Sequence, residues 1–147
     1  MPTVTINPIA TEELASITVS TTSVHTPLLT NGSGAAIPQY SAVYMKTDGT
    51  LALALADDAD TAKVIGFASE TLVDGGTGRI TVAGTSGYIS ETDSAAVVDG
   101  DLLYISSTEA GSVTKTSPSG TDVAINSLGR AVGSEILVEI GVQVVLA

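Results

Sequence analysis

The strongest constraint on the fold is a recurring pattern of short apolar segments separated by turn signals. From residue 37 onward, short runs of apolar and β-branched residues alternate with turns rich in glycine and aspartate. Asp48-Gly49 and Asp74-Gly75-Gly76 are two such turns. Strand-length segments that recur about every 8–12 residues are typical of all-β sandwiches and barrels. The pattern therefore predicts an all-β fold, a small β-barrel or sandwich.

The pattern occurs twice, over residues 37–92 and again over residues 93–147. Tyr44 and Tyr104 lie in similar apolar segments 60 positions apart, and Gly66 and Gly129 lie in similar segments 63 positions apart. The two offsets agree within three residues. An internal repeat of this kind favours two duplicated β-units folded into one domain with pseudo-two-fold symmetry. The alternative is chance similarity between short β-motifs that share turn glycines.

Residues 1–36 precede this domain, residues 37–147, and are expected to form an N-terminal arm and a loop. Residues 11–15 have the pattern of one or two helical turns, and residues 16–21 alternate like a strand. Residues 22–36 contain Pro27 and Asn31-Gly32 and predict a loop. The apolar residues of the arm either complete the domain's own core or add to a neighbouring protein; they are Val4, Ile6, Ile9 and Leu14.

Composition excludes several classes of partner. Lys and Arg number 5 against 16 Asp and Glu, which gives a net charge of -11. So few cations cannot neutralise a long phosphate track, and binding to an anionic membrane needs clustered Lys and Arg. No apolar run approaches the roughly 18 residues of a membrane span. We therefore expect neither nucleic acid nor membrane as a partner. The chain has no cysteine, which excludes a disulfide framework.

The sequence offers few groups for catalysis or metal binding. His25 is the single histidine and would have to be the base of any Ser/His/Asp triad. No Gly-x-Ser-x-Gly motif presents a nucleophile, so His25 is interpreted as a loop residue. The acidic run of Asp57, Asp58 and Asp60 lacks the spacing of a calcium loop and is interpreted as a solvated loop. We expect no enzymatic activity, no metal and no cofactor.

Three other motifs have structural explanations. Asp99 and Asp101 flank Gly100 and fit a turn in which carboxylates accept backbone N–H bonds better than an acid–base pair. The glycine-rich segment 74–79 has no P-loop lysine, so a hairpin loop is expected there. Asn31-Gly32-Ser33 matches a glycosylation sequon, but the chain shows no secretory signal.

Arg79 and Arg130 are the two arginines of this acidic chain, and both lie beside predicted strands. We expect each to pair with a carboxylate at the surface. If either lies at a subunit contact, it is a candidate interaction anchor.

The order of motifs from Pro38 to Tyr88 resembles a known family. It runs through Val43-Tyr44-Met45, Asp48-Gly49-Thr50-Leu51-Ala52, an acidic loop, Val64-Ile65-Gly66-Phe67-Ala68, a Gly/Thr loop, Arg79-Ile80-Thr81-Val82 and Gly84-Thr85-Ser86-Gly87-Tyr88. This order is similar to that of the head decoration, or cement, proteins of lambda-type tailed bacteriophages. Residues 100–131 are similar to repeat-like modules of phage decoration and head-fibre proteins.

The resemblance implies a tulip-like β-barrel and a function without catalysis. The protein would be a homotrimer on the outer capsid surface of a virion, made in the host cytoplasm, and would stabilise the capsid by binding the major capsid protein. Its N-terminal segment would become ordered on the capsid. The chain departs from the family in being longer, with an apparent second repeat. The alternative function is a head-fibre or tail-fibre module that binds a host-surface ligand.

Overall fold

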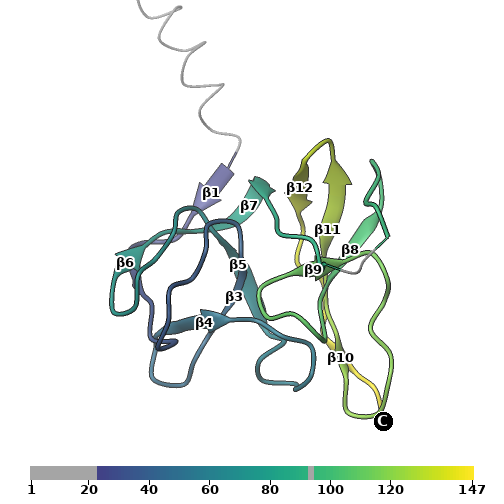
Figure 1. Ribbon diagram of the computed structural model, residues 1–147, viewed down its shortest axis with the longest axis horizontal. Helices are drawn as coiled ribbons and strands as arrows, with labels where there is room; N and C mark the ends of the chain where they lie inside the picture. The colour runs from purple at the N-terminus through teal and green to yellow at the C-terminus, as the bar shows by residue number, and fades with distance from the viewer. Residues whose placement is uncertain (1–22, 93–94) are drawn as a thin grey trace, which may run out of the picture.

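The computed structural model describes residues 23–92 and 95–147, and every regular element in these residues is a β-strand, so the predicted all-β fold is confirmed (Figure 1). The strands are β1 (Ser23–His25), β2 (Leu29–Thr30), β3 (Ala42–Met45), β4 (Leu51–Leu53), β5 (Val64–Ala68), β6 (Thr77–Gly78), β7 (Ile80–Gly87), β8 (Leu102–Ile105), β9 (Val113–Thr114), β10 (Ala124–Ile125), β11 (Ser127–Val132), β12 (Glu135–Val138) and β13 (Val144–Val145). The predicted arm residues Val4, Ile6, Ile9 and Leu14 lie outside the described residues.

One curled antiparallel sheet carries most of the strands, in the order β4-β3-β5-β7-β12-β11-β8-β9, with β1 also paired to β7. Two small sheets, β2·β6 and β10·β13, complete the described fold. The two halves of this sheet meet at the β7·β12 pair and have the same strand order. Counted outward from this pair, the first half runs β7-β5-β3-β4 and the second half runs β12-β11-β8-β9. In each half the strand that comes last in the sequence thus lies at the centre of the sheet, and a short strand lies at its outer edge. Figure 1 shows the two halves side by side.

The hydrogen-bond register repeats this correspondence between the two halves. Val43 of β3 lies opposite Gly66, and Leu103 of β8 lies opposite Gly129. In both ladders the register then shifts by one residue before the tyrosine. Tyr44 and Tyr104, which the sequence aligns, therefore occupy equivalent places; the duplication of one ancestral unit stays a prediction.

The outer edge strands are also covered in the same way. Leu51 of β4 forms a parallel bridge to Asn31, and Val113 of β9 forms a parallel bridge to Ser90. Each bridging segment comes just before its own half of the sheet. Since an uncovered edge strand invites pairing with other chains, both ends of the main sheet are protected by backbone from within the chain.

The prediction of a loop over residues 22–36 was wrong for the described part of that range, because residues 23–36 contain two strands. β1 pairs with β7 and β2 pairs with β6. The turn signal at Pro27 is real, and it separates the two strands. Thr26 N–H donates to the Ile80 carbonyl over 2.9 Å and fixes this connection. The partners of these strands are 47 to 61 residues away in the sequence, so local propensity could not reveal them.

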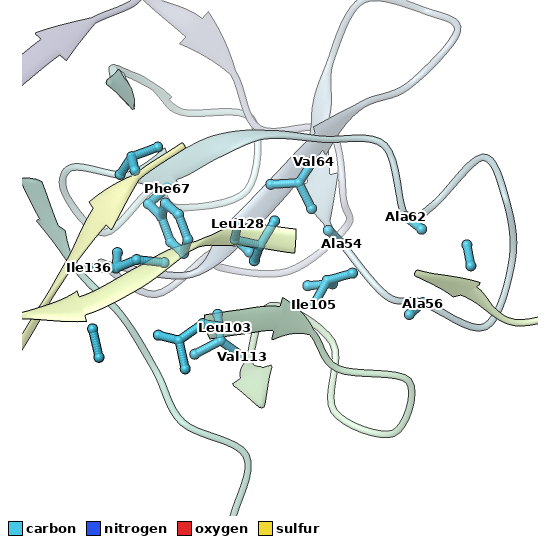
Figure 2. Close-up of a cluster of buried hydrophobic side chains, with 14 residues drawn as sticks. Ala54, Ala56, Ala62, Val64, Phe67, Leu103, Ile105, Val113, Leu128 and Ile136 are labelled. Carbon is cyan, nitrogen blue, oxygen red and sulfur yellow. The ribbon is translucent and has the colours of Figure 1, made fainter. Parts of the chain in front are cut away.

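The core consists of two clusters. The main core is formed by both halves together, and in Figure 2 Phe67 from the first half points toward Leu128 and Ile136 from the second. Its residues are Ala42, Ala54, Ala56, Ala62, Val64, Phe67, Leu103, Ile105, Val113, Ala124, Leu128, Ala131, Ile136 and Val138. The second core belongs to the first half alone and consists of Ile37, Val43, Leu51, Ala68, Leu72 and Ile80.

Equivalent residues of the two halves face different surroundings. Phe67 lies in the main core and its neighbour Ala68 lies in the second core, on the other face of β5. In the second half Ala131, which is equivalent to Ala68, lies in the main core. Successive side chains of a strand point to opposite faces. Arg130, which is equivalent to Phe67, therefore points away from the main core and is exposed.

A backbone irregularity in β7 explains this exchange of faces. Thr81 lies opposite Phe67 and Ser86 lies opposite Ile136, so both face the main core. They are five positions apart, an odd number, so regular alternation would put them on opposite faces. Between them Gly84 has a φ of +83°, a conformation that glycine adopts without steric cost. Because of this interruption, Thr81 at the start of β7 and Ser86 near its end can both point toward the main core.

Candidate interaction surface

The outward face of the second half forms an exposed surface of mixed character. We define the outer face as Leu102 of β8, Arg130 and Val132 of β11, and Glu135 and Leu137 of β12. In the ladder Leu102 lies opposite Arg130, and Arg130 lies opposite Leu137, so the three side chains form one row across the sheet. Val132 is 55% exposed and Leu137 is 46% exposed. The outer face thus presents an arginine among exposed apolar side chains.

Arg130 does not have the carboxylate partner that was predicted for it. Its Nη1 donates to the carbonyl of Gly100 over 2.9 Å, and within residues 23–92 and 95–147 no carboxylate lies within 4.0 Å of it. The prediction was wrong because its cross-strand neighbours are leucines. A guanidinium has five N–H donors, so most of its donors remain available to another molecule.

The turn that receives this hydrogen bond is fixed by two aspartates. Val98 N–H donates to Asp101 over 2.9 Å, and Gly133 N–H donates to Asp99 over 2.7 Å. These bonds confirm the predicted structural role of the two carboxylates in a turn. They also hold the Gly100 carbonyl, and with it the Arg130 side chain, in position.

The equivalent row of the first half shows what the outer face would look like when covered. There Ala42, Phe67 and Thr81 occupy the places of Leu102, Arg130 and Leu137, and all three are buried. The second half supplies the cover for that row through the main core. No segment among the described residues covers the corresponding row in the second half.

Arg79 lies elsewhere, immediately before β7, and also has no carboxylate partner within 4.0 Å among the described residues. The predicted pairing is therefore wrong for this arginine as well. It lines an open hollow together with His25, Ser69 and Glu70. His25 Nδ1 lies 3.2 Å from Thr81 Oγ1. Thr81 is itself buried, whereas the His25 side chain is exposed.

The remaining predicted motifs serve the local backbone. Asp58 accepts the Asp60 N–H over 2.7 Å, and an ion pair with Lys63 lowers the pKa of Asp60. The side-chain amide of Asn31 is buried and donates to the carbonyls of Ala35 and Leu72. In the described part of the chain, no three His, Asp or Glu residues are grouped as metal ligands would be. The same residues contain no helix long and apolar enough to cross a membrane.

Glu91 holds the segment that covers the edge of β9, and its pKa is lowered by hydrogen bonds from Thr108 and Ser106. A carboxylate whose pKa falls on folding stabilises the fold above its unfolded pKa, near 4.5 here, and this contribution is lost as the pH falls. We expect Glu91→Gln to reduce the free energy of unfolding by about 1–2 kcal/mol at pH 7. Urea unfolding at pH 7 and at pH 3 measures this difference, which should shrink at pH 3. A difference that is constant with pH would contradict the assignment.

No protein-family model matches the chain, and a comparison with curated proteins finds no significant match. The resemblance to lambda-type decoration proteins therefore stays a prediction, and the outer face is defined by its geometry.

Proposed function

We propose that this chain is a non-enzymatic structural protein of a virion that binds the outside of a bacteriophage capsid and stabilises it. The observation that carries the proposal is the row of Leu102, Arg130 and Leu137 on the outer face. An arginine with free donors beside apolar side chains is the composition of an interface centre. The order of motifs in residues 38–88 and the net charge of -11 support a role at an outer protein surface.

The mechanism that we infer is mechanical. A subunit that bridges neighbouring capsid proteins adds buried area where an expanded shell would otherwise open. Specific interfaces bury about 1,600 Å² in total, and a homotrimer would multiply the effect through avidity. The outer face would bind a region of the major capsid protein where a carboxylate lies beside apolar side chains, since a carboxylate matches the guanidinium fork.

The predicted arm would add to the same attachment. Val4, Ile6, Ile9 and Leu14 could bind the capsid by adding backbone to a sheet edge, as the resemblance implies. This part of the proposal concerns residues outside the described structure. It can be separated from the outer face by testing variants of each region independently.

Removing the Arg130 side chain is expected to weaken binding to expanded capsids by at least about ten-fold, the effect of losing an interface centre. The measurement is co-sedimentation of the full chain with expanded and precursor capsids of the same phage. Lys63→Ala removes the same charge from a distant loop and should leave binding unchanged.

Failure of the wild-type chain to sediment with expanded capsids would exclude the proposed function. Equal binding by Arg130→Ala and the wild type would exclude the outer face as the contact. Retention of the protein on a glycan array, without capsid binding, would favour the alternative of a fibre module.

A further inference from the structure

The C-terminal strand β13 is the outermost strand of its small sheet. On one side it pairs with β10, with Val145 opposite Ala124. β10 in turn contacts the first half, because the Ala124 N–H donates to the Ala56 carbonyl over 3.0 Å. Bridging segments lie beside the edge strands β4 and β9, but none among the described residues lies beside β13. The second side of β13 is therefore an open edge.

Val145 directs its backbone N–H and carbonyl toward this open edge. The next residue, Leu146, has both groups on the side of β10, where its N–H donates to the Val123 carbonyl over 2.9 Å. The Leu146 carbonyl accepts the Asp122 N–H over 3.0 Å. Successive residues of an antiparallel strand present these groups to opposite sides, so those of Val145 point away from β10. Neither group has a hydrogen-bond partner among the described residues. The edge can therefore bind a further strand without losing a bond to β10.

The side chains along the open edge carry no charge. Residues 141–147 contain no acidic residue, no basic residue and no proline. Three valines of this segment are exposed, namely Val142, Val144 and Val145. Natural proteins usually protect an exposed edge strand with charges, a proline or a bulge. An unprotected edge of this kind is typical of a strand that pairs with another chain.

A second copy of the same strand has the chemistry that fits this edge. The net charge of -11 makes two copies repel each other over most of their surfaces, whereas two β13 strands bring no like charges together. Antiparallel pairing also makes the strand complementary to itself. With Val145 opposite the same residue of the second copy, each free N–H donates to the free carbonyl of the other copy. The uncharged edge and its free backbone groups therefore favour a second copy as the occupant.

We propose that β13 pairs antiparallel with β13 of a second copy, about a two-fold axis that passes between the two Val145 residues. The small sheets of the two copies thereby join into one continuous sheet. A two-fold contact uses the same surface of each copy and closes at two copies, so it differs from the three-fold association of the proposed homotrimer. In Figure 1 the C-terminus lies at the end of the second half opposite the β11–β12 turn. The contact therefore leaves the outer face around that turn exposed, and the inference does not depend on the proposed function.

Cysteine cross-linking tests this register directly, because the chain has no cysteine of its own. In the proposed pairing the two Val145 Cα atoms lie about 5.5 Å apart, within the range that a disulfide spans. We expect full-length Val145→Cys to form disulfide-linked dimers under mild oxidation, several times more than Val144→Cys. Val144 is the matched control because it is 53% exposed against 49% for Val145. Its counterpart in the second copy is displaced along the strand, beyond the reach of a disulfide.

The same register predicts a second link. Val144 lies opposite Leu146 of the second copy, so a mixture of Val144→Cys and Leu146→Cys chains should give mixed dimers at several times the yield of Val144→Cys alone. Equal self-linking of Val144→Cys and Val145→Cys would overturn the proposal, because it would follow exposure and not the register. Absence of self-linked Val145→Cys would also overturn it.

Light scattering of the full-length variants at rising protein concentration gives an independent readout. Val145→Pro removes the free N–H and keeps the bonds between β13 and β10, whereas Val145→Thr keeps the N–H. We expect Val145→Thr to associate like the wild type and Val145→Pro to associate less, with unchanged circular dichroism. Identical association of the two variants would overturn the proposal.

Co-sedimentation with expanded capsids separates this contact from capsid binding. We expect Val145→Pro to retain the capsid binding of the wild type, since the outer face is unchanged. Loss of capsid binding by Val145→Pro, without self-linking of Val145→Cys, would overturn the proposal and assign the open edge to a strand of the capsid protein.

Discussion

Replacing Gly129 with alanine is expected to reduce the free energy of unfolding by about 4 kcal/mol or more, as substitutions that create a strong steric conflict do. Gly129 has a φ of +145°, and a Cβ atom there would lie 1.9 Å from the carbonyl oxygen of Leu137. The obstacle is backbone of the paired strand β12, which cannot turn aside like a side chain. Since domains of this size have a total stability of about 5–15 kcal/mol, the variant should be largely destabilised. Urea unfolding followed by circular dichroism measures the loss.

Gly133→Ala is the matched control for this prediction. Gly133 lies in the turn between the same two strands with a φ of +62°, and a Cβ atom there would meet nothing within 4 Å. We expect a loss of about 1–2 kcal/mol, the conformational cost alone. Gly66 occupies the equivalent place in the first half, where a Cβ atom would lie 2.2 Å from the Thr81 carbonyl. Gly66→Ala should therefore resemble Gly129→Ala. Similar stability of Gly129→Ala and Gly133→Ala would contradict the close approach of β11 and β12.

Phe67→Ala is expected to reduce the free energy of unfolding by about 3–5 kcal/mol, the usual effect of removing a buried aromatic side chain. Phe67 is completely buried in the main core, where the two halves meet. Truncation at the equivalent position of the second half, Arg130→Ala, should change stability by no more than about 0.5 kcal/mol, because that side chain is exposed. The pair separates a residue that holds the halves together from one that is available for contact. Chemical denaturation of both variants provides the comparison.

Comparable losses for Phe67→Ala and Arg130→Ala would mean that the two equivalent rows are buried alike, contrary to the exposed outer face. Phe67→Leu provides a further control, because it retains most of the apolar volume. We expect it to be clearly more stable than Phe67→Ala.

Much of the fold could be predicted because its signals are local. The Asp48-Gly49 turn appears as expected, with Gly49 at a φ of +82° and the N–H of Thr50 donating to Asp48. The Thr50 hydroxyl, and after it this N–H, lower the pKa of Asp48 to about 2. The strands β1 and β2 were missed because their short sequences acquire structure only through distant partners. Their pairing depends on long-range contacts that no local pattern contains.

The outer face could be predicted only in part. Arg130 was identified from its residue type, but Val132 and Leu137 were not. The sequence Ile136-Leu137-Val138 is apolar throughout, so it cannot indicate which face is inward. The available signal was the alignment of the halves, which puts Arg130 at the position of Phe67. Interpreting that signal required the change of face at Gly84, which depends on the backbone conformation.

The shared strand β7 also determines how the protein can come apart. Its first residues complete the first half by pairing with β5, and its last residues begin the second half by pairing with β12. The main core likewise draws its side chains from both halves. A partly unfolded form that keeps one half and loses the other would expose that core and free an edge of β7. We therefore expect the two units to unfold as one foldon, in a single cooperative transition despite their repeated architecture.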